Sequence, residues 1–269
     1  MAVHPTAVVD RRANLHQSAD IGPYVVIDGP VRLGANTRVY AHAYLSGWTE
    51  IGADCHIHPG AVVGHLPQDT AYSGDETYCR VGHGTVIREG ASIHRGTAPG
   101  SATVIGNSCM IMANAHVGHN CLVGDEVKLT NGSLLAGHVT VGDGAFISAL
   151  SAIHQFARIG RLVMVAGFTR VLMDVPPFFT VDAGRCVGVN TVGMRRAGMT
   201  REERSDVKRA YRILYRSGKP FRDAVDLLAE SVTTDAGQEI VAFLREPSRR
   251  GICGGTKDFD NRDEGGTTD

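Results

Sequence analysis

The stretch IGNSCMIMANAHVGHNCLVGDEVKLTNGSLLAGHVTV, residues 105–141, decides the fold of this chain. An aliphatic residue recurs in it at every sixth position, from Ile105 to Val141. A period of six differs from the 3.6 residues per turn of an α-helix and from the 3.5 of a coiled coil. It is typical of short strands joined by tight turns, each of which buries one aliphatic side chain in a shared narrow core.

The same phase runs through most of the chain. From Val3 to Val171 in steps of six there are 29 positions, and 26 of them are Ile, Leu or Val. The exceptions are Asp69, Asp75 and Pro99. An ordinary β-sandwich is the alternative, but sandwich strands are not strictly periodic. The pattern therefore predicts an all-β left-handed parallel β-helix of hexapeptide repeats, with 18-residue coils, over residues 1–178.

Two polar, turn-rich segments interrupt the rhythm, at about 66–78 and 97–103. We expect them to be loops that leave the coil wall. Loops on a rigid scaffold are where binding residues concentrate, although tolerated surface insertions would give the same pattern.

The C-terminal part has helical spacing instead. Residues 179–252 are predicted to form an α-helical domain after the prolines of MDVPPFFTV end the coil. Thr200 and Glu203 have the form of a capping box, Pro220 can start a second helix, and a third is expected at roughly 235–245. The polar, glycine-rich tail at 253–269 is predicted to be disordered.

Composition excludes several functional classes. Lys and Arg total 27 against 28 Asp and Glu, so no strong field favours nucleic acid as a partner. No apolar run is long enough for a membrane span, and the N-terminus lacks the layout of a signal peptide, which predicts a cytoplasmic protein. The six cysteines have no metal-ligand spacing and are expected to be free thiols.

The densest group of reactive residues lies in NAHVGHNC (114–121) and LAGH (135–138). His116 and His119 have a spacing that zinc ligands use, but no third ligand follows, so no metal is expected. With 18 residues per coil, Gly137 should lie directly over His119, and His138 over Asn120. A histidine base beside a backbone N–H donor is the pair that acyl transfer requires.

Eight segments carry more information than the repeat: VHPTA (3–7), IHRGT (93–97), NAHVGHNC (114–121), LAGH (135–138), AIHQF (152–156), DVPP (174–177), YRILYRSGK (211–219) and SRRGI (248–252). Together they resemble the UDP-N-acetylglucosamine 3-O-acyltransferase family that begins lipid A synthesis, over about residues 3–252. The resemblance implies transfer of a (3-hydroxy)acyl chain from acyl carrier protein to the 3-position of UDP-GlcNAc. It also implies a homotrimer with sites between subunits. The donor would be carried on the phosphopantetheine arm, with no other cofactor.

The resemblance also implies roles for single residues. His119 matches the general base, and Gly137 matches the donor to the oxyanion. The residues that would surround the sugar and the reacting acyl group are Gln68, Asp69, His116 and His138. His154 and Gln155 match contacts to the nucleotide end, and Asn190 and Arg196 match nucleotide and phosphate contacts. Gly167 falls where the family measures acyl length, and a glycine there leaves room for a long chain.

Four positions depart from the family's pattern: Asn120 stands where Asp is usual, Ala71 where the first loop has Lys, Val192 for Glu and Ala197 for a second Arg. An amide at position 120 cannot supply the charge that would raise the basicity of a neighbouring histidine. The departures leave open a sister acyltransferase that acts on the 3-amino analogue UDP-GlcNAc3N or on another nucleotide-sugar acceptor. A non-catalytic β-helix binding protein is a third interpretation, against which the retained His119, Gly137 and His138 argue.

Overall fold

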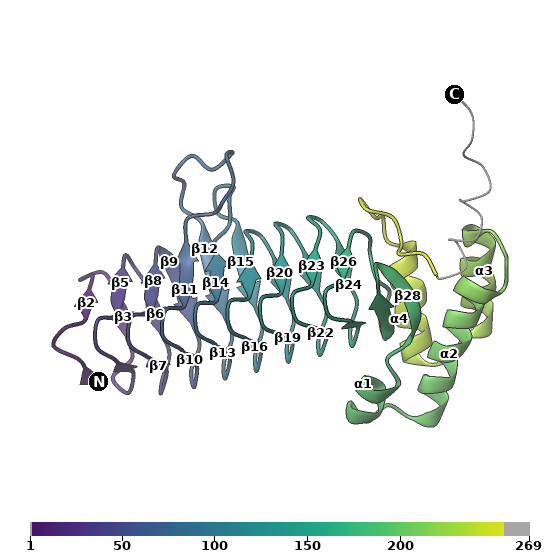
Figure 1. Cartoon of the computed structure of the whole chain (residues 1–269), viewed down its shortest axis with the longest axis horizontal. Coiled ribbons are helices and arrows are strands. Elements are labelled where there is room, and N and C mark those ends of the chain that lie inside the picture. The colour runs from purple at the N-terminus through teal and green to yellow at the C-terminus, as the bar shows by residue number, and fades with distance from the viewer. Residues whose placement is uncertain (1, 256–269) are drawn as a thin grey trace.

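The computed structural model describes residues 2–255, and these form a long, three-sided coil that ends in a group of helices (Figure 1). Each side of the coil is one sheet, because the chain adds a strand to each of three sheets in turn. The predicted left-handed parallel β-helix with helices at its C-terminal end is confirmed.

The three sheets differ in length but have the same construction. The eleven-strand sheet contains β1 (Ala2–Val3), β4 (Asp20–Ile21), β7 (Arg38–Val39), β10 (His56–Ile57), β13 (Val86–Ile87), β16 (Met110–Ile111), β19 (Lys128–Leu129), β22 (Phe146–Ile147), β25 (Met164–Val165), β27 (Phe179–Asp182) and β28 (Arg185–Val189). The nine-strand sheet contains β2 (Val8–Val9), β5 (Val26–Asp28), β8 (Tyr44–Ser46), β11 (Val62–His65), β14 (Ser92–His94), β17 (His116–Val117), β20 (Leu134–Leu135), β23 (Ala152–Ile153) and β26 (Arg170–Val171). The eight-strand sheet contains β3 (Asn14–Leu15), β6 (Arg32–Leu33), β9 (Trp48–Ile51), β12 (Tyr78–Val81), β15 (Ala102–Ile105), β18 (Leu122–Val123), β21 (Thr140–Val141) and β24 (Arg158–Ile159).

Strand pairing follows the six-residue repeat. Val117 pairs with Leu135 in parallel register, eighteen residues further along the chain, and both side chains are fully buried. Turns at the corners carry one residue with left-handed backbone, such as Asn120 and His138, each with φ of 59°. Asn and His tolerate this region better than most residues with a side chain. The repeat thereby fixes which residues form the core and which lie at a corner.

Two insertions leave the coil where the sequence predicts loops. No strand lies within residues 66–77, the first insertion, or within residues 95–101, the second insertion. Both project from the same side of the coil, beside β12 and β15 (Figure 1). Ile51 pairs with Val81 and Val81 with Ile105, thirty and twenty-four residues apart instead of eighteen. The extra lengths are multiples of six, so the core residues keep their phase across both insertions.

The helices are α1 (Thr191–Arg196), α2 (Arg201–Arg216), α3 (Phe221–Ser231) and α4 (Asp235–Arg245). The capping box is confirmed, since the Thr200 hydroxyl accepts from the Glu203 N–H and the Glu203 carboxylate accepts from the Thr200 N–H. Helix α4 has the predicted bounds. The range 179–252, predicted as helical, begins with β27 and β28, and its first helix, α1, was not predicted.

The helices close the C-terminal end of the coil. Phe179 packs edge-on against the rings of Tyr211 and Tyr215, with centroids 5.7 Å away in both cases. Arg158 donates to the fully buried Asp174 at 2.7 Å and forms an ion pair with Glu246 after α4. The end of the coil is therefore covered by apolar side chains and a buried ion pair.

The tail predicted over 253–269 lies outside the described residues from 256 onward. Its first three residues are packed, because Cys253 is buried and Gly254 accepts a hydrogen bond from the Cys186 N–H. All six cysteines are buried free thiols. Among the described helices, none has the length and apolar character that crossing a membrane requires.

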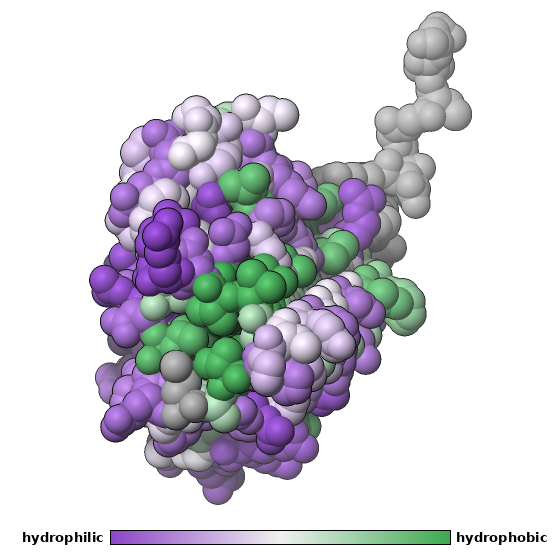
Figure 2. Space-filling view, turned by 90° about the vertical axis from the view of Figure 1, so that its left-hand side faces the viewer, coloured by the Kyte–Doolittle hydropathy of each residue, from purple (hydrophilic) through white to green (hydrophobic). Residues whose placement is uncertain are grey.

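The N-terminal end of the coil has no such cover within the described residues. Apolar side chains gather at this end of the molecule (Figure 2). Val3 and Val8 are exposed there, and Val9 and Leu15 are only half-buried, because no earlier coil lies beneath them.

Candidate active site

Three consecutive coils bring histidines together along the edge between the nine-strand and eight-strand sheets. This histidine edge consists of the turns at residues 118–121, 136–139 and 154–157. Since the strands before and after these turns pair eighteen residues apart, His119, Gly137 and Gln155 occupy equivalent places in successive coils. The predicted placement of Gly137 over His119 is confirmed.

The imidazole of His119 is held from two sides by the two insertions. It is 8% exposed. Its Nδ1 lies 2.8 Å from the hydroxyl of Thr97 in the second insertion and 3.0 Å from the Asn120 side-chain oxygen. Its Nε2 lies 3.5 Å from the Asp69 carboxylate in the first insertion. The loops predicted to carry binding residues therefore meet at this ring.

The hydrogen bonds of Asn120 assign the proton of the neutral imidazole. The Asn120 Oδ1 accepts from the backbone N–H of Thr97 at 3.1 Å, which fixes the orientation of the amide. The same oxygen can only accept from His119 Nδ1, because a carbonyl oxygen has no proton to donate. The neutral ring then has its proton on Nδ1 and its lone pair on Nε2, which faces Asp69.

Gly137 leaves the space in which this ring lies. A Cβ placed on Gly137 would be 2.4 Å from Nε2 of His119, so any side chain there would displace the imidazole. The next residue, His138, donates its backbone N–H to the His119 carbonyl at 2.9 Å. Among the described residues no hydrogen bond is formed by the Gly137 N–H. A free backbone donor thus lies beside a histidine with a free lone pair.

A hollow of about 320 Å³ opens beside this edge. His138 stacks on Phe156 with ring centroids 4.9 Å apart, and the Arg249 guanidinium lies 4.8 Å from the Phe156 centroid on the segment after α4. His138, Phe156 and Arg249 line the hollow together with Asn120. Burial, the nearby His119 and Arg249 lower the pKa of His138, and Asp69 opposes the shift. The hollow is therefore lined by neutral imidazole, aromatic and cationic groups.

Two further histidines continue the row along the nine-strand sheet. His116 Nδ1 lies 2.8 Å from the Ser92 hydroxyl, and its ring meets that of His94 edge-on at 5.0 Å. Burial lowers the pKa of His116, and His119 adds to the effect. Burial and the neighbouring His116 lower the pKa of His94 to about 4. Both rings are thus neutral near pH 7.

Other predicted residues lie further from His119. Gln68 is exposed on the first insertion, and His154 and Gln155 lie at the next turn of the histidine edge. Gly167 lies at a different corner of the coil, between the eleven-strand and nine-strand sheets. The Asn190 side chain caps α1 by accepting from the Gly193 N–H, and it donates to the Leu162 carbonyl. Arg196 is exposed in the last turn of α1.

Sequence reasoning missed three residues of this site. Thr97 ends the IHRGT segment and begins the predicted loop at 97–103, which was a usable signal. Phe156 and Arg249 lie in AIHQF and SRRGI, but only the folded chain brings them together. Of the departing positions, Ala71, Val192 and Ala197 are exposed, whereas Asn120 contacts the ring directly.

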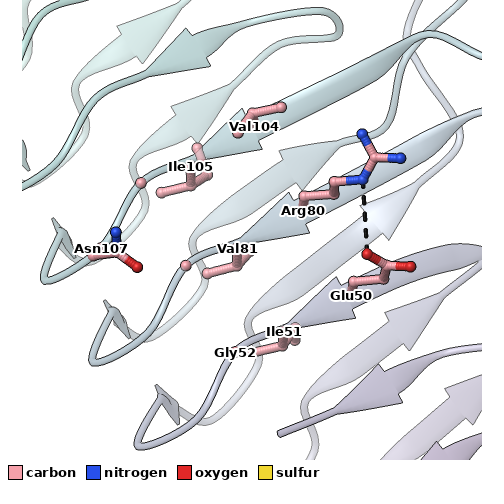
Figure 3. Close-up of a pocket in the computed structure, with 10 residues that line it drawn as sticks. Glu50, Ile51, Gly52, Arg80, Val81, Val104, Ile105 and Asn107 are labelled. Atoms are coloured by element: carbon pink, nitrogen blue, oxygen red, sulfur yellow. Dashed lines mark ion pairs between the residues drawn. The ribbon is translucent and has the colours of Figure 1, made fainter.

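A second hollow, of about 390 Å³, lies on the eight-strand sheet away from these residues (Figure 3). Its charged groups are Glu50 and Arg80 on the neighbouring strands β9 and β12, which form an ion pair at 3.7 Å. It contains no histidine and no unpaired carboxylate, so it offers no base. Within residues 2–255, no group of three His, Cys, Asp or Glu side chains is arranged to hold a metal ion.

Comparisons with known proteins agree with this fold. Residues 174–253 match the family described as UDP-N-acetylglucosamine O-acyltransferase, domain 2, and residues 30–65 and 102–137 match the bacterial transferase hexapeptide family. The acyl-[acyl-carrier-protein]–UDP-N-acetylglucosamine O-acyltransferase of Synechocystis sp. is 40% identical over 95% of both chains. That of Anaeromyxobacter dehalogenans is 44% identical over 94% of this chain and 99% of its own.

Solved structures give the same result. The UDP-N-acetylglucosamine acyltransferase of Francisella novicida superposes with a TM-score of 0.90 at 37% identity, over 94% of each chain. That of Bacteroides fragilis gives 0.90 at 35% identity, over 93% of this chain and 99% of its own. With both sequence and fold shared over nearly the whole length, the chain belongs to the acyl-[acyl-carrier-protein]–UDP-N-acetylglucosamine O-acyltransferase family.

Proposed function

We propose that this chain transfers a (3-hydroxy)acyl group from acyl carrier protein to the 3-position of UDP-GlcNAc, the first step of lipid A biosynthesis, with His119 as the general base. The relatives are named as acyl-[acyl-carrier-protein]–UDP-N-acetylglucosamine O-acyltransferases. The observation that carries the mechanism is the orientation of His119. Asn120 holds the proton on Nδ1, so the lone pair of Nε2 is available to a substrate.

The reaction needs one base and one oxyanion donor. Nε2 of His119 takes the proton of the sugar 3-hydroxyl as the oxygen attacks the thioester carbonyl. The carbonyl oxygen becomes negative and is stabilised by the backbone N–H of Gly137. When the tetrahedral intermediate collapses, the C–S bond breaks and the thiolate of the phosphopantetheine arm takes the proton back from His119. Asp69, beside Nε2, stabilises the imidazolium in between.

The remaining predicted residues would bind the two substrates. Gln68, His116 and His138 would bind the sugar and the reacting acyl group. His154 and Gln155, one coil further along the histidine edge, would contact the nucleotide, and so would Asn190 and Arg196. The donor arrives on its phosphopantetheine arm, and no metal or other cofactor takes part.

A homotrimer would complete the site. Gly167 lies on a different corner from His119, and Asn190 and Arg196 lie beyond the end of the coil. These residues would serve the His119 site only across a subunit boundary. The exposed Phe168 and Leu150, at the same corner as Gly167, give a neighbouring subunit and an acyl chain an apolar surface. We place the protein in the cytoplasm, where acyl carrier protein and UDP-sugars would meet it.

UDP-GlcNAc3N is the second candidate acceptor, and Asn120 favours it. The amide beside Nδ1 brings no charge to strengthen His119 as a base. An amine that arrives unprotonated is a stronger nucleophile than a hydroxyl and needs less assistance. Another nucleotide sugar stays a third option, since Val192 and Ala197 alter the surface around α1.

Mass spectrometry of the products decides between these functions. The purified protein is incubated with acyl carrier proteins that carry acyl chains of several lengths, and with UDP-GlcNAc or UDP-GlcNAc3N. We expect one acylated UDP-sugar, absent with His119→Ala. If neither sugar is acylated and no UDP-sugar raises the thermal stability of the protein, the proposal is contradicted and a binding protein is favoured.

A further inference from the structure

Arg95 is a buried cation that the proposed reaction does not use. It begins the second insertion, directly after β14, and its side chain is 7% exposed. Its guanidinium makes hydrogen bonds to two neutral oxygens and, among residues 2–255, no ion pair. Its Nε is buried without a partner. Because arginine is seldom buried without a carboxylate, its position needs another explanation.

The contacts of Arg95 join three parts of the chain. Its Nη1 donates to the Gly64 carbonyl in the coil wall at 3.1 Å, and its Nη2 donates to the Tyr72 hydroxyl in the first insertion at 2.9 Å. The guanidinium also lies over the rings of Tyr72 and Trp48, at 5.6 and 5.8 Å from their centroids. Gly47 leaves room for it, since a Cβ there would lie 2.4 Å from Nη1.

Tyr72 and Asp69 belong to one turn of the first insertion. The Asp69 carbonyl accepts from the Tyr72 N–H at 3.1 Å, and Asp69 Oδ1 accepts from the Ala71 N–H at 2.9 Å. These bonds leave Oδ2 of Asp69 facing Nε2 of His119 at 3.5 Å. Holding the Tyr72 ring therefore also holds the carboxylate.

We infer that Arg95 is a positioning residue that fixes the two insertions to each other, so that Asp69 and Thr97 meet His119 from opposite sides. The inference rests on the proposed function, because it assigns Arg95 an effect on that reaction. The rigid, planar guanidinium suits the task, since it reaches two acceptors at once and stacks on aromatic rings. A lysine would keep the charge but not this geometry.

A mutant cycle separates positioning from general stabilisation. Arg95→Met and Tyr72→Phe are made singly and together, in the natural chain and in Asp69→Asn, and kcat and KM for the UDP-sugar are measured. We expect each single change to lower kcat by about 10- to 100-fold, with Arg95→Lys only partly active. In Asp69→Asn the same changes should lower kcat by a clearly smaller factor than in the natural chain, because only the position of Thr97 is then left to disturb. Equal losses in both backgrounds would overturn the inference.

Hydrogen exchange tests the same link without turnover. We expect Tyr72→Phe and Arg95→Met to speed exchange of the Ala71 and Tyr72 amides but not of amides in β17 and β20. Unchanged exchange in the first insertion would refute the link. Tyr72→Phe decides the question if Arg95→Met folds poorly, and Tyr24→Phe, at an exposed ring far from His119, is the control. If the natural chain has no activity, the proposed function is contradicted. Hydrogen exchange would still test whether Arg95 holds the first insertion in place.

Discussion

The imidazole of His119 occupies the space that a side chain on Gly137 would need, since a Cβ there would lie 2.4 Å from Nε2. Residue 137 therefore combines two structural features. Its backbone N–H has no hydrogen-bond partner among the described residues, and its lack of a side chain lets the histidine lie beneath it.

Gly137→Ala should lower kcat by about 100-fold or more, because the methyl group displaces the ring from the reacting atoms. Steady-state kinetics with acyl carrier protein and the UDP-sugar measure the loss. Gly188→Ala is the matched control, since a Cβ there meets nothing within 4 Å. Full activity of Gly137→Ala would show that the close approach has no part in the reaction.

His119→Ala should lower kcat by about 10²- to 10⁴-fold, the usual effect of losing a general base, and leave the assembly intact. Kinetics and sedimentation are measured on the same sample. His16→Ala, at an exposed histidine on the third corner of an early coil, should keep both. Near-normal turnover of His119→Ala would exclude this histidine as the base.

Asn120→Asp should raise kcat/KM or shift the pH optimum, because a carboxylate next to Nδ1 stabilises the imidazolium that forms when His119 takes a proton. Aspartate also tolerates the left-handed backbone at this corner. The pH–rate profile is the measurement, with Asn114→Asp at the equivalent place of another corner as the control. An identical profile would argue against a charge effect at position 120.

Gly167→Leu should shift the preference toward shorter acyl chains. The kcat/KM for a donor whose acyl chain would reach residue 167 should fall by about 10-fold or more relative to a donor whose chain ends before it. A Cβ at this position meets only the Ala149 carbonyl, at 3.4 Å, so the side chain fits without unfolding the coil. The shift is measured by competition between acyl carrier proteins that carry acyl chains of different lengths. An unchanged preference would remove Gly167 as the acyl ruler.

His94 should make the fold sensitive to acid. Burial lowers its pKa to about 4 from 6.5, so between these values the unfolded chain binds a proton that the folded chain does not. Stability is therefore complete above pH 6.5 and is lost as the pH falls toward 4, by about 3 kcal/mol. Urea unfolding at pH 7 and pH 5 should detect about 2 kcal/mol of this loss. His94→Gln should reduce the difference between the two pH values, and His16→Gln should not. If the free energy of unfolding changes equally between pH 7 and pH 5 in both variants, His94 is not the source of the acid sensitivity.

The coil could be predicted almost residue by residue. Each aliphatic residue of the six-residue phase contributes to one narrow core, so a shift of one position would expose all of them. That constraint made it possible to place Gly137 over His119 by counting eighteen residues. The capping box at Thr200 and the bounds of α4 were also readable, because caps and helical spacing are local signals.

Elements without a period could not be predicted in this way. Helix α1 is only six residues long and starts at Thr191, directly after Asn190, whose side chain caps it. Strands β27 and β28 lie in a range predicted as helical, because they continue a sheet after the repeat has ended. The sequence of α1 and the sequences of β27 and β28 are too short to be told from a loop of the same composition.

The sequence alone determined the β-helix, the family and the stacking of the histidine edge. The tertiary structure decided how His119 is held: which insertion reaches which nitrogen, and how Arg95 ties Tyr72 to the coil wall. The physical reason is that parallel pairing fixes residues eighteen apart, whereas no repeat governs the path of an insertion. Asp69 and Thr97 meet one imidazole because two loops pack on each other, and that packing exists only in the folded chain.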